Sequence, residues 1–251
     1  MPDPKVIRFD KQAGIGLPRW PDIPAGRLES GSPVQGGIMY FERPEIGLSA
    51  GIWECTAFTG KMEAYPEHEF MFLLEGEITI VEAGGKSTTI RAGESFIIPR
   101  GLQCQWRQPG RVRKFFVIYQ APAAAPIAAS GLTVIKLDHG LVPKESSPAP
   151  APETLIGPVP SQRSHTYYTD PSGQLTIGIW DTSYYHRKTV PFPRYELMHF
   201  LDGAVSMTHE DGSTEAFKAG DSVFVPLGTM ADFKVDGEYL RKIYVIFMPQ
   251  S

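Results

Sequence analysis

The stretch Glu69-Phe70-Met71-Phe72-Leu73-Leu74-Glu75-Gly76 lies in the first half of the chain, and a related stretch from Glu196 to Gly203 follows 127 residues later. Other phrases return at the same distance: Gly51-Ile52-Trp53 as Gly178-Ile179-Trp180, and Pro99-Arg100-Gly101 as Pro226-Leu227-Gly228. Self-similarity at one fixed period indicates a duplicated structural unit, and this period is the length of one small domain. The sequence therefore predicts two tandem copies of one fold.

Each copy consists of short apolar or alternating runs that are separated by turn residues. The strand candidates of the first copy are Phe70–Leu74, Ile78–Val81, Ser95–Ile98 and Phe115–Tyr119. Helical periodicity does not extend over a dozen residues anywhere, whereas 25 glycines and 23 prolines are available for turns. Strands at this spacing predict an all-β sandwich or barrel in each copy.

An Ala/Pro-rich run, Ala121–Pro126, lies between the copies and is typical of a semi-rigid connector. We therefore predict an N-terminal domain at residues 1–120, a linker at 121–131 and a C-terminal domain at 132–251.

Composition narrows the possible partners. The 251 residues carry a net charge of −4, and no basic stripe points to nucleic acid. No apolar run approaches the roughly 20 residues that would span a bilayer, and the N-terminus lacks the apolar core of a signal peptide. Two cysteines do not make a disulfide framework in a chain of this length. We expect a cytoplasmic protein that binds neither nucleic acid nor membranes.

The two repeats resemble the cupin superfamily. Glu69 to Gly76 is similar to the first cupin motif, in which a glutamate precedes a strand that ends in Gly. Gly93-Glu94 through Pro99-Arg100-Gly101 is similar to the second motif, and Gly220-Asp221 restores its usual Asp in the second copy. The resemblance covers about residues 36–119 and 163–247 and implies a bicupin. Such a protein has two tandem RmlC-like jelly-roll barrels that are related by a pseudo-twofold axis.

Further residues narrow the resemblance. Trp53, Trp106 and the closing phrase Val112-Arg113-Lys114 are similar to the cupin subfamily that contains (S)-ureidoglycine aminohydrolase. Cupins serve as hydrolases, isomerases, oxygenases, storage proteins and regulators, so the fold by itself does not assign an activity.

Cupin enzymes generally hold one divalent metal through an His-x-His pair, the first-motif Glu and a later His, and the resemblance places these positions here. In the first copy they fall on Glu63, Tyr65, Glu69 and Cys104, and in the second copy on Val190, Phe192, Glu196 and Ala231. No usual histidine is present in either copy, and hard oxygens with one thiolate make an unusual ligand set. We predict no metal cofactor; the alternative is one divalent transition metal in the N-terminal barrel.

If the strand is not bulged at Pro66, period-two alternation places Glu63, Tyr65 and Glu69 on one face of it, and the same rule places Cys104 and Trp106 on one face of theirs. In a cupin barrel this face is the interior, so we predict that these five residues form a ligand-binding pocket. One of two neighbouring carboxylates should then have a raised pKa, unless Lys61 or an Arg of the closing strand neutralises them. The second copy, apolar at the same positions, is expected to be filled.

Three functions are consistent with these residues. We favour a small-molecule-binding protein with its polar pocket in the N-terminal barrel and no usual cupin metal site. The alternative is a metal-dependent hydrolase or isomerase that resembles (S)-ureidoglycine aminohydrolase and acts on a small nitrogen-containing or carboxylated metabolite. A purely structural module is the third. No catalytic residue is assigned, and a homodimer is expected.

Overall fold

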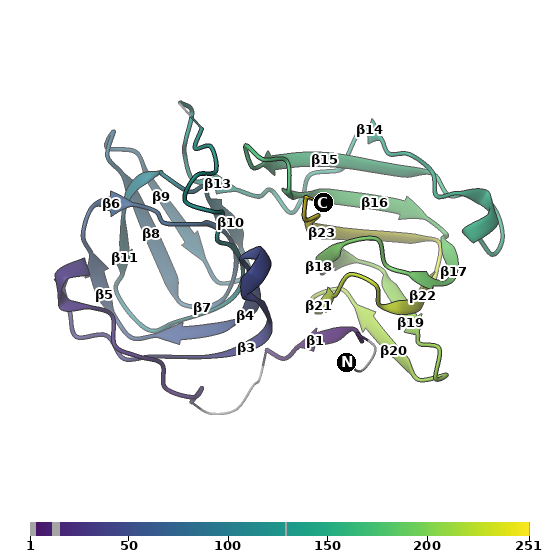
Figure 1. Ribbon diagram of the computed structural model, residues 1–251, viewed down its shortest axis with the longest axis horizontal. Coiled ribbons are helices and arrows are strands. Elements are labelled where there is room, and N and C mark those ends of the chain that lie inside the picture. The colour runs from purple at the N-terminus through teal and green to yellow at the C-terminus, as the bar shows by residue number, and fades with distance from the viewer. Residues whose placement is uncertain (1–3, 12–15, 129, 251) are drawn as a thin grey trace. The chain divides into compact units, whose positions relative to one another are not determined.

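The computed structural model describes residues 4–11, 16–128 and 130–250, which form two compact units (Figure 1). The N-terminal barrel comprises Asp10–Leu137 with Asp170–Ser172. The C-terminal barrel comprises the described residues up to Phe9, Asp138–Thr169 and the described residues from Gly173 onward. Apart from three 3-10 helices of three residues each, at Ala25–Arg27, Pro44–Ile46 and Pro152–Thr154, the regular elements of the described residues are strands. The predicted all-β fold with two barrels is confirmed.

Two antiparallel sheets form the N-terminal barrel. One has the order β13-β10-β7-β12-β4-β3, and the other has the order β2-β5-β11-β8-β9 with β6 paired to β11. The strands are β2 (Leu28–Ser30), β3 (Gln35–Arg43), β4 (Leu48–Cys55), β5 (Phe58–Gly60), β6 (Glu63–Ala64), β7 (His68–Glu75), β8 (Glu77–Glu82), β9 (Ser87–Arg91), β10 (Ser95–Ile98), β11 (Gln103–Gln108), β12 (Val112–Tyr119) and β13 (Ile135–Lys136).

The C-terminal barrel repeats this plan with a seven-stranded sheet, β1-β21-β18-β23-β16-β15-β14, and a four-stranded sheet, β17-β22-β19-β20. Its strands are β1 (Ile7–Phe9), β14 (Glu145–Ser146), β15 (Gln162–Thr169), β16 (Leu175–Ser183), β17 (His186–Pro191), β18 (Tyr195–Asp202), β19 (Ala204–Thr208), β20 (Thr214–Lys218), β21 (Ser222–Val225), β22 (Met230–Val235) and β23 (Tyr239–Phe247).

The glycine that ends the first motif has the same structural cause in both barrels. Gly76 and Gly203 turn the chain with φ of +84° and +80°. A side chain there would also collide with a backbone carbonyl oxygen, that of Arg111 beside Gly76 and that of Tyr239 beside Gly203. Only glycine combines this left-handed backbone with such a close approach, which explains why the repeat retains it.

The first strand of each sequence copy belongs to the barrel built mainly by the other copy. β1 pairs with β21 in the C-terminal barrel, and β13 pairs with β10 in the N-terminal barrel. Each borrowed strand covers the backbone edge that β10 or β21 would otherwise leave unpaired. The division predicted from sequence, with a linker at 121–131, does not include this exchange; residue 129 lies outside the described residues.

Each barrel interior is closed by an apolar cluster. Met71, Leu73, Ile80 and Phe96 are fully buried in the N-terminal barrel, and Met198, Phe200, Val205 and Phe217 have the same role in the C-terminal barrel. Across the described residues, no helix is long and apolar enough to cross a membrane.

Candidate functional site

The N-terminal barrel contains a cavity of about 580 Å³. Its apolar wall includes Trp20, Trp53, Phe58 and Trp106, and Phe58 stacks on Trp106 with ring centroids 6.5 Å apart. The charged side chains of the lining are three acids, Asp22, Glu63 and Glu67, and three bases, Arg27, Lys61 and Lys114. The formal charges of the wall therefore cancel. A cavity with aromatic walls and a few polar groups is typical of a small-molecule site.

Lys114 of β12, which lines this cavity, forms a buried ion pair with Glu69 of β7, with Lys114 Nζ 2.5 Å from Glu69 Oε1. Lys114 faces Leu73 in the strand register, so its stem runs back along β7 and its ammonium lies 3.0 Å from Met71 Sδ. The ammonium also lies 4.9 Å from the ring centre of Trp53. Hydrogen bonds and an aromatic face therefore offset the loss of hydration that burial imposes on both charges.

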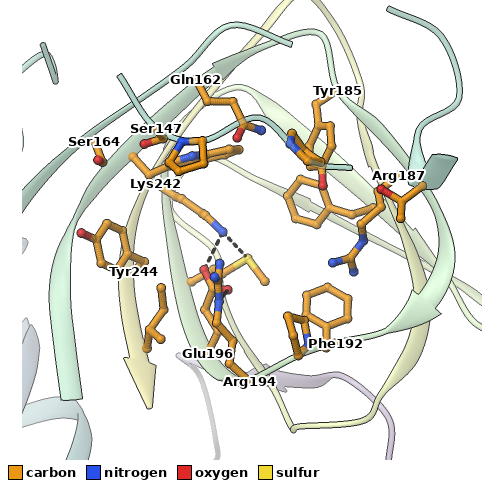
Figure 2. A pocket seen from close by; sticks show the side chains of 18 of the residues that line it. Ser147, Gln162, Ser164, Tyr185, Arg187, Phe192, Arg194, Glu196, Lys242 and Tyr244 are labelled. Atoms are coloured by element: carbon orange, nitrogen blue, oxygen red, sulfur yellow. Dashed lines mark hydrogen bonds and ion pairs between the residues drawn. The ribbon is translucent and has the colours of Figure 1, made fainter. Parts of the chain in front are cut away.

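The C-terminal barrel repeats this pair. Lys242 Nζ lies 2.7 Å from Glu196 Oε1, 3.0 Å from Met198 Sδ and 4.9 Å from the ring centre of Trp180 (Figure 2). The duplicated unit thus carries a buried Lys–Glu pair as well as a fold. Sequence reasoning selected the two glutamates but not the two lysines, although the lysine ends the closing phrase that supported the family resemblance.

The five predicted site residues fall into two layers. Glu63, Tyr65, Cys104 and Trp106 line the N-terminal cavity, whereas Glu69 is buried behind it and accepts a hydrogen bond from the Tyr65 hydroxyl. The single strand expected from Glu63 to Glu69 is interrupted around Pro66, because Glu63 lies on β6, Glu69 on β7 and Tyr65 between them. The sequence led us to expect two neighbouring carboxylates, one with a raised pKa. Glu63 is not that residue, because Arg27 neutralises its carboxylate through a hydrogen bond of 2.8 Å from Arg27 Nε.

The carboxylate with the raised pKa is Glu67, which sequence reasoning did not select. Burial, and secondarily the charge of Glu69, raise the pKa of Glu67 to about 7 against the opposing charges of Lys114 and Arg27. The same two causes raise the pKa of the Tyr65 phenol well above its ordinary value. Glu67 is therefore the cavity group that changes protonation near neutral pH.

Cys104 shows no sign of activation as a nucleophile. Burial, followed by the charges of Glu82 and Glu63, raises the pKa of its thiol to about 11. A thiol reacts through its thiolate, and this one stays protonated at neutral pH. Cys104 packs in the apolar cluster with Leu102, so it acts as a small buried hydrophobe.

The expectation that the C-terminal barrel is filled is wrong, because this barrel contains a cavity of about 550 Å³ (Figure 2). The positions that correspond to cupin metal ligands are indeed apolar there. The polar groups come from elsewhere: Arg187 of β17, Arg194 immediately before β18, and Lys242 of β23. The segment from Ser147 to Thr154 adds to the wall.

The two cavities differ in charge at equivalent positions. Pro66-Glu67-His68-Glu69 aligns with Pro193-Arg194-Tyr195-Glu196, so an acid in one barrel is a base in the other. Arg194 Nε lies 3.0 Å from Glu196 Oε2. Burial acts to raise the pKa of Glu196, but Arg194 and Lys242 outweigh it and lower that pKa to about 2. Glu196 therefore remains ionised throughout the neutral range.

Neither barrel presents a donor set that fits the transition metal of cupin enzymes. Among the described residues, no three His, Cys, Asp or Glu side chains gather into a group that could hold a metal ion. In both barrels an ammonium already occupies the space beside the first-motif glutamate. The nearby thiol and phenol of the N-terminal barrel hold their protons firmly, whereas a metal needs deprotonated ligands. The buried lysine is the cationic partner of the glutamate.

The duplication is matched by a family model, that of the EutQ-like cupin domain, at residues 44–116 and again at 169–244. The chain belongs to this family. Its two barrels are therefore two EutQ-like cupin domains, and the family resemblance inferred from the motifs is confirmed at this level. No curated protein matches the sequence significantly.

Solved structures match this cupin over nearly its whole length. A protein of unknown function of the DUF861 family from Pseudomonas syringae is 28% identical, with a TM-score of 0.80 over 97% of this chain and 99% of that one. A protein named as glyoxylate-induced, from Pseudomonas aeruginosa, is 12% identical, with a TM-score of 0.61 over 98% and 90%. YlbA of E. coli, also of the DUF861 family, is 10% identical, with a TM-score of 0.55 over 99% and 93%. The last two similarities show the fold alone.

Proposed function

We propose that this cupin binds a small molecule in the N-terminal cavity and does so without the transition metal of other cupins. The observation that carries the proposal is Glu67, a carboxylate in an aromatic-walled cavity whose pKa is about 7. No described residue hydrogen-bonds to this carboxylate, whereas Glu63 and Glu69 are paired with Arg27 and Lys114. Glu67 is thus the carboxylate that remains available to a ligand.

The chemistry of the wall indicates the class of ligand. An ionised Glu67 accepts hydrogen bonds, so the matching group is an amine, amide or hydroxyl. Trp106 and Phe58 are only half buried, and their flat faces suit a planar apolar body. A small nitrogen-containing molecule with a planar part satisfies both requirements. The homodimer and the cytoplasmic location stay predictions.

Benzylamine is a suitable probe because it combines a ring with one ammonium group. We expect it to bind, and to bind about tenfold more weakly for each pH unit below 7, because protonation of Glu67 removes the partner of the ammonium. Glu67→Gln should weaken binding by about tenfold or more at pH 8 and remove this pH dependence. Isothermal titration calorimetry measures both effects.

Glu42→Gln is the matched control, because Glu42 is an exposed carboxylate of β3 and is not part of the cavity lining. Its affinity for benzylamine should equal that of the unmodified protein. Binding that survives Glu67→Gln unchanged, or no binding of benzylamine at any pH, would contradict the proposal.

Acid–base catalysis is a second candidate function, and the pKa of Glu67 favours it. A carboxylate tuned to about 7 can accept a proton and return it at neutral pH, and Tyr65 links this region to Glu69 through its hydroxyl. Turnover of a substrate that Glu67→Gln abolishes, while substrate binding persists, would distinguish an enzyme from a binding protein.

Metal analysis tests the other half of the proposal. Protein purified without chelator should contain far less than one Mn, Fe, Ni or Zn per chain, because Lys114 and Lys242 already neutralise Glu69 and Glu196. Addition of these metals should leave the melting temperature unchanged. A content of one metal per chain that Glu69→Ala abolishes would contradict the proposal that the N-terminal cavity works without a metal.

A further inference from the structure

The cavity of the C-terminal barrel has an excess of positive charge that its own residues do not neutralise. Its charged lining residues are Arg187, Arg194 and Lys242 against the single carboxylate of Glu196. Arg194 and Lys242 both contact that carboxylate, at 3.0 Å and 2.7 Å. Arg187 is a third cation that does not contact this carboxylate. The charged side chains of the lining therefore have a net charge of about +2 in the absence of a ligand.

Arg187 carries unsatisfied hydrogen-bonding capacity at this place. Its Nε and Nη2 atoms are buried and have no hydrogen-bond partner among the described residues. The guanidinium lies over the ring of Phe192, 4.1 Å from the ring centre, and points into the cavity (Figure 2). Burial lowers the pKa of Arg187, and the opposing charges of Tyr185, Glu196 and Asp232 do not outweigh this effect. Such a group in a native fold needs an explanation.

We propose that this second cavity is an anion site that binds the carboxylate of a small organic acid through Arg187. A guanidinium presents two parallel N–H groups that match the two oxygens of a carboxylate. Tyr185 and Gln162 also line the cavity and can donate further hydrogen bonds. The carboxylate thereby supplies the negative charge that the lining lacks.

The rest of the wall favours an organic acid over a bare inorganic anion. Trp180, Val190, Met198 and Phe233 line the same cavity and offer apolar surface next to the charged cluster. Inorganic phosphate would leave this surface uncovered, whereas the hydrocarbon part of a carboxylic acid would cover it. The duplicated barrels would then bind ligands of opposite charge, an amine beside Glu67 and a carboxylate beside Arg187.

Benzoate tests this site, with benzylamine and inorganic phosphate as comparison probes in calorimetry. We expect benzoate to bind the full-length protein with a dissociation constant below about 1 mM, and Arg187→Gln to weaken it by about 10–100-fold. Arg187→Gln should leave benzylamine binding unchanged, because Arg187 does not line the N-terminal cavity. Loss of one probe response therefore does not imply loss of the other.

The stability of the empty protein provides a second readout. Removal of a desolvated, unpaired cation should raise the melting temperature of Arg187→Gln by about 2–4 °C without ligand, although the variant binds benzoate more weakly. Lys188→Gln is the matched control, because Lys188 is an exposed cation on the same strand and is not in the lining. That variant should bind benzoate normally.

Three results would overturn the inference. The first is a wild-type protein that does not bind benzoate at millimolar concentration. The second is benzoate binding that Arg187→Gln leaves intact. The third is phosphate binding tighter than benzoate at Arg187, which would assign the site to inorganic oxyanions in place of organic acids.

Discussion

Glu196→Gln is expected to lower the free energy of unfolding by about 3–5 kcal/mol, whereas Glu69→Gln should lower it by only about 1–3 kcal/mol. Both changes remove the carboxylate of a buried Lys–Glu pair that the two barrels share. The difference arises from what remains around the lysine in each barrel, so the two substitutions form a matched comparison within one chain.

In the C-terminal barrel, no other carboxylate of the described residues lines the cavity and could replace the lost charge. Glu196→Gln leaves Arg187, Arg194 and Lys242 facing one cavity without a carboxylate in its lining. Breaking a buried ion pair by removing one member is costly because the other charge stays desolvated. Here two contacting cations lose their partner at once.

In the N-terminal barrel a second carboxylate is available. Glu67 lies close enough for Lys114 to lower its pKa and for Glu69 to raise it. Without the Glu69 charge, Glu67 ionises more easily and can neutralise Lys114. In the Glu69→Gln variant, the amide oxygen of the new side chain can still accept the hydrogen bond from Tyr65. The loss at this position is therefore smaller.

Chemical denaturation followed by tryptophan fluorescence measures both losses. Trp180 belongs to the C-terminal barrel and the other three tryptophans to the N-terminal barrel, so the change in emission at each transition identifies the barrel that unfolds. A further variant that combines Glu196→Leu with Lys242→Met and Arg194→Met should recover much of the lost stability, because it removes the carboxylate together with both cations that contact it. Equal losses for Glu196→Gln and Glu69→Gln would contradict the role assigned to Glu67.

The sequence predicts the fold well because the relevant signals are local and occur twice. The turn glycines Gly76 and Gly203 are required by backbone geometry. The strands are indicated by the alternation of side chains with a period of two residues. These properties can be counted along the chain. The exchanged strands β1 and β13 are different, because their pairing with β21 and β10 is a long-range choice that no local pattern encodes.

The candidate site is only partly predictable from the sequence, because long side chains contact residues that are distant in the strand register. Tyr65 reaches the cavity from the segment between β6 and β7, whereas Cys104 and Trp106 are brought to the lining by strand parity along β11. Strand parity does not reveal that Lys114, opposite Leu73 in the register, extends along β7 to Glu69. Long side chains link positions several residues apart on a neighbouring strand, so residue spacing alone misses them.

The error about the C-terminal barrel came from comparing only the positions of metal ligands. Val190, Phe192 and Ala231 are apolar, as the sequence showed, but Arg187 and Arg194 lie outside those positions and supply the charge. A signal was present in the aligned phrases, where Glu67 is replaced by Arg194 between a proline and the shared glutamate. A reversal of charge beside a shared buried residue indicates that the second cavity is altered and not lost.

The two barrels should respond to pH in opposite directions. Glu196 has a pKa of about 2 in the folded protein against 4.5 for an ordinary glutamate. Its contribution to stability is therefore present above pH 4.5 and is lost as the pH falls toward 2. At 1.36 kcal/mol for each pKa unit, this contribution amounts to about 3 kcal/mol in the C-terminal barrel.

Glu67 has the reverse sign, because its folded pKa of about 7 lies above 4.5. The folded N-terminal barrel is favoured fully below pH 4.5, and that advantage is lost as the pH rises through 7. We expect a loss of about 1–2 kcal/mol, smaller than the full shift implies because Glu67 is only partly buried and solvent screens its charge. Glu67→Gln should remove this loss and make the N-terminal barrel more stable than the unmodified one at pH 8.

The free energy of unfolding is measured against pH for a variant and for the unmodified protein, and one curve is subtracted from the other. The contributions of all other titrating groups cancel in this difference, so it reports the substituted carboxylate alone. The free energy of unfolding of Glu67→Gln minus that of the unmodified protein should be near its minimum at pH 4.5 and rise by about 1–2 kcal/mol up to pH 8. Glu42→Gln, an exposed carboxylate outside the cavity, should give a flat difference. A difference for Glu67→Gln that is flat from pH 4.5 to 8, or that falls, would mean that Glu67 is solvated and ionised like a surface residue. The N-terminal cavity would then lack the titrating carboxylate on which its proposed ligand chemistry depends.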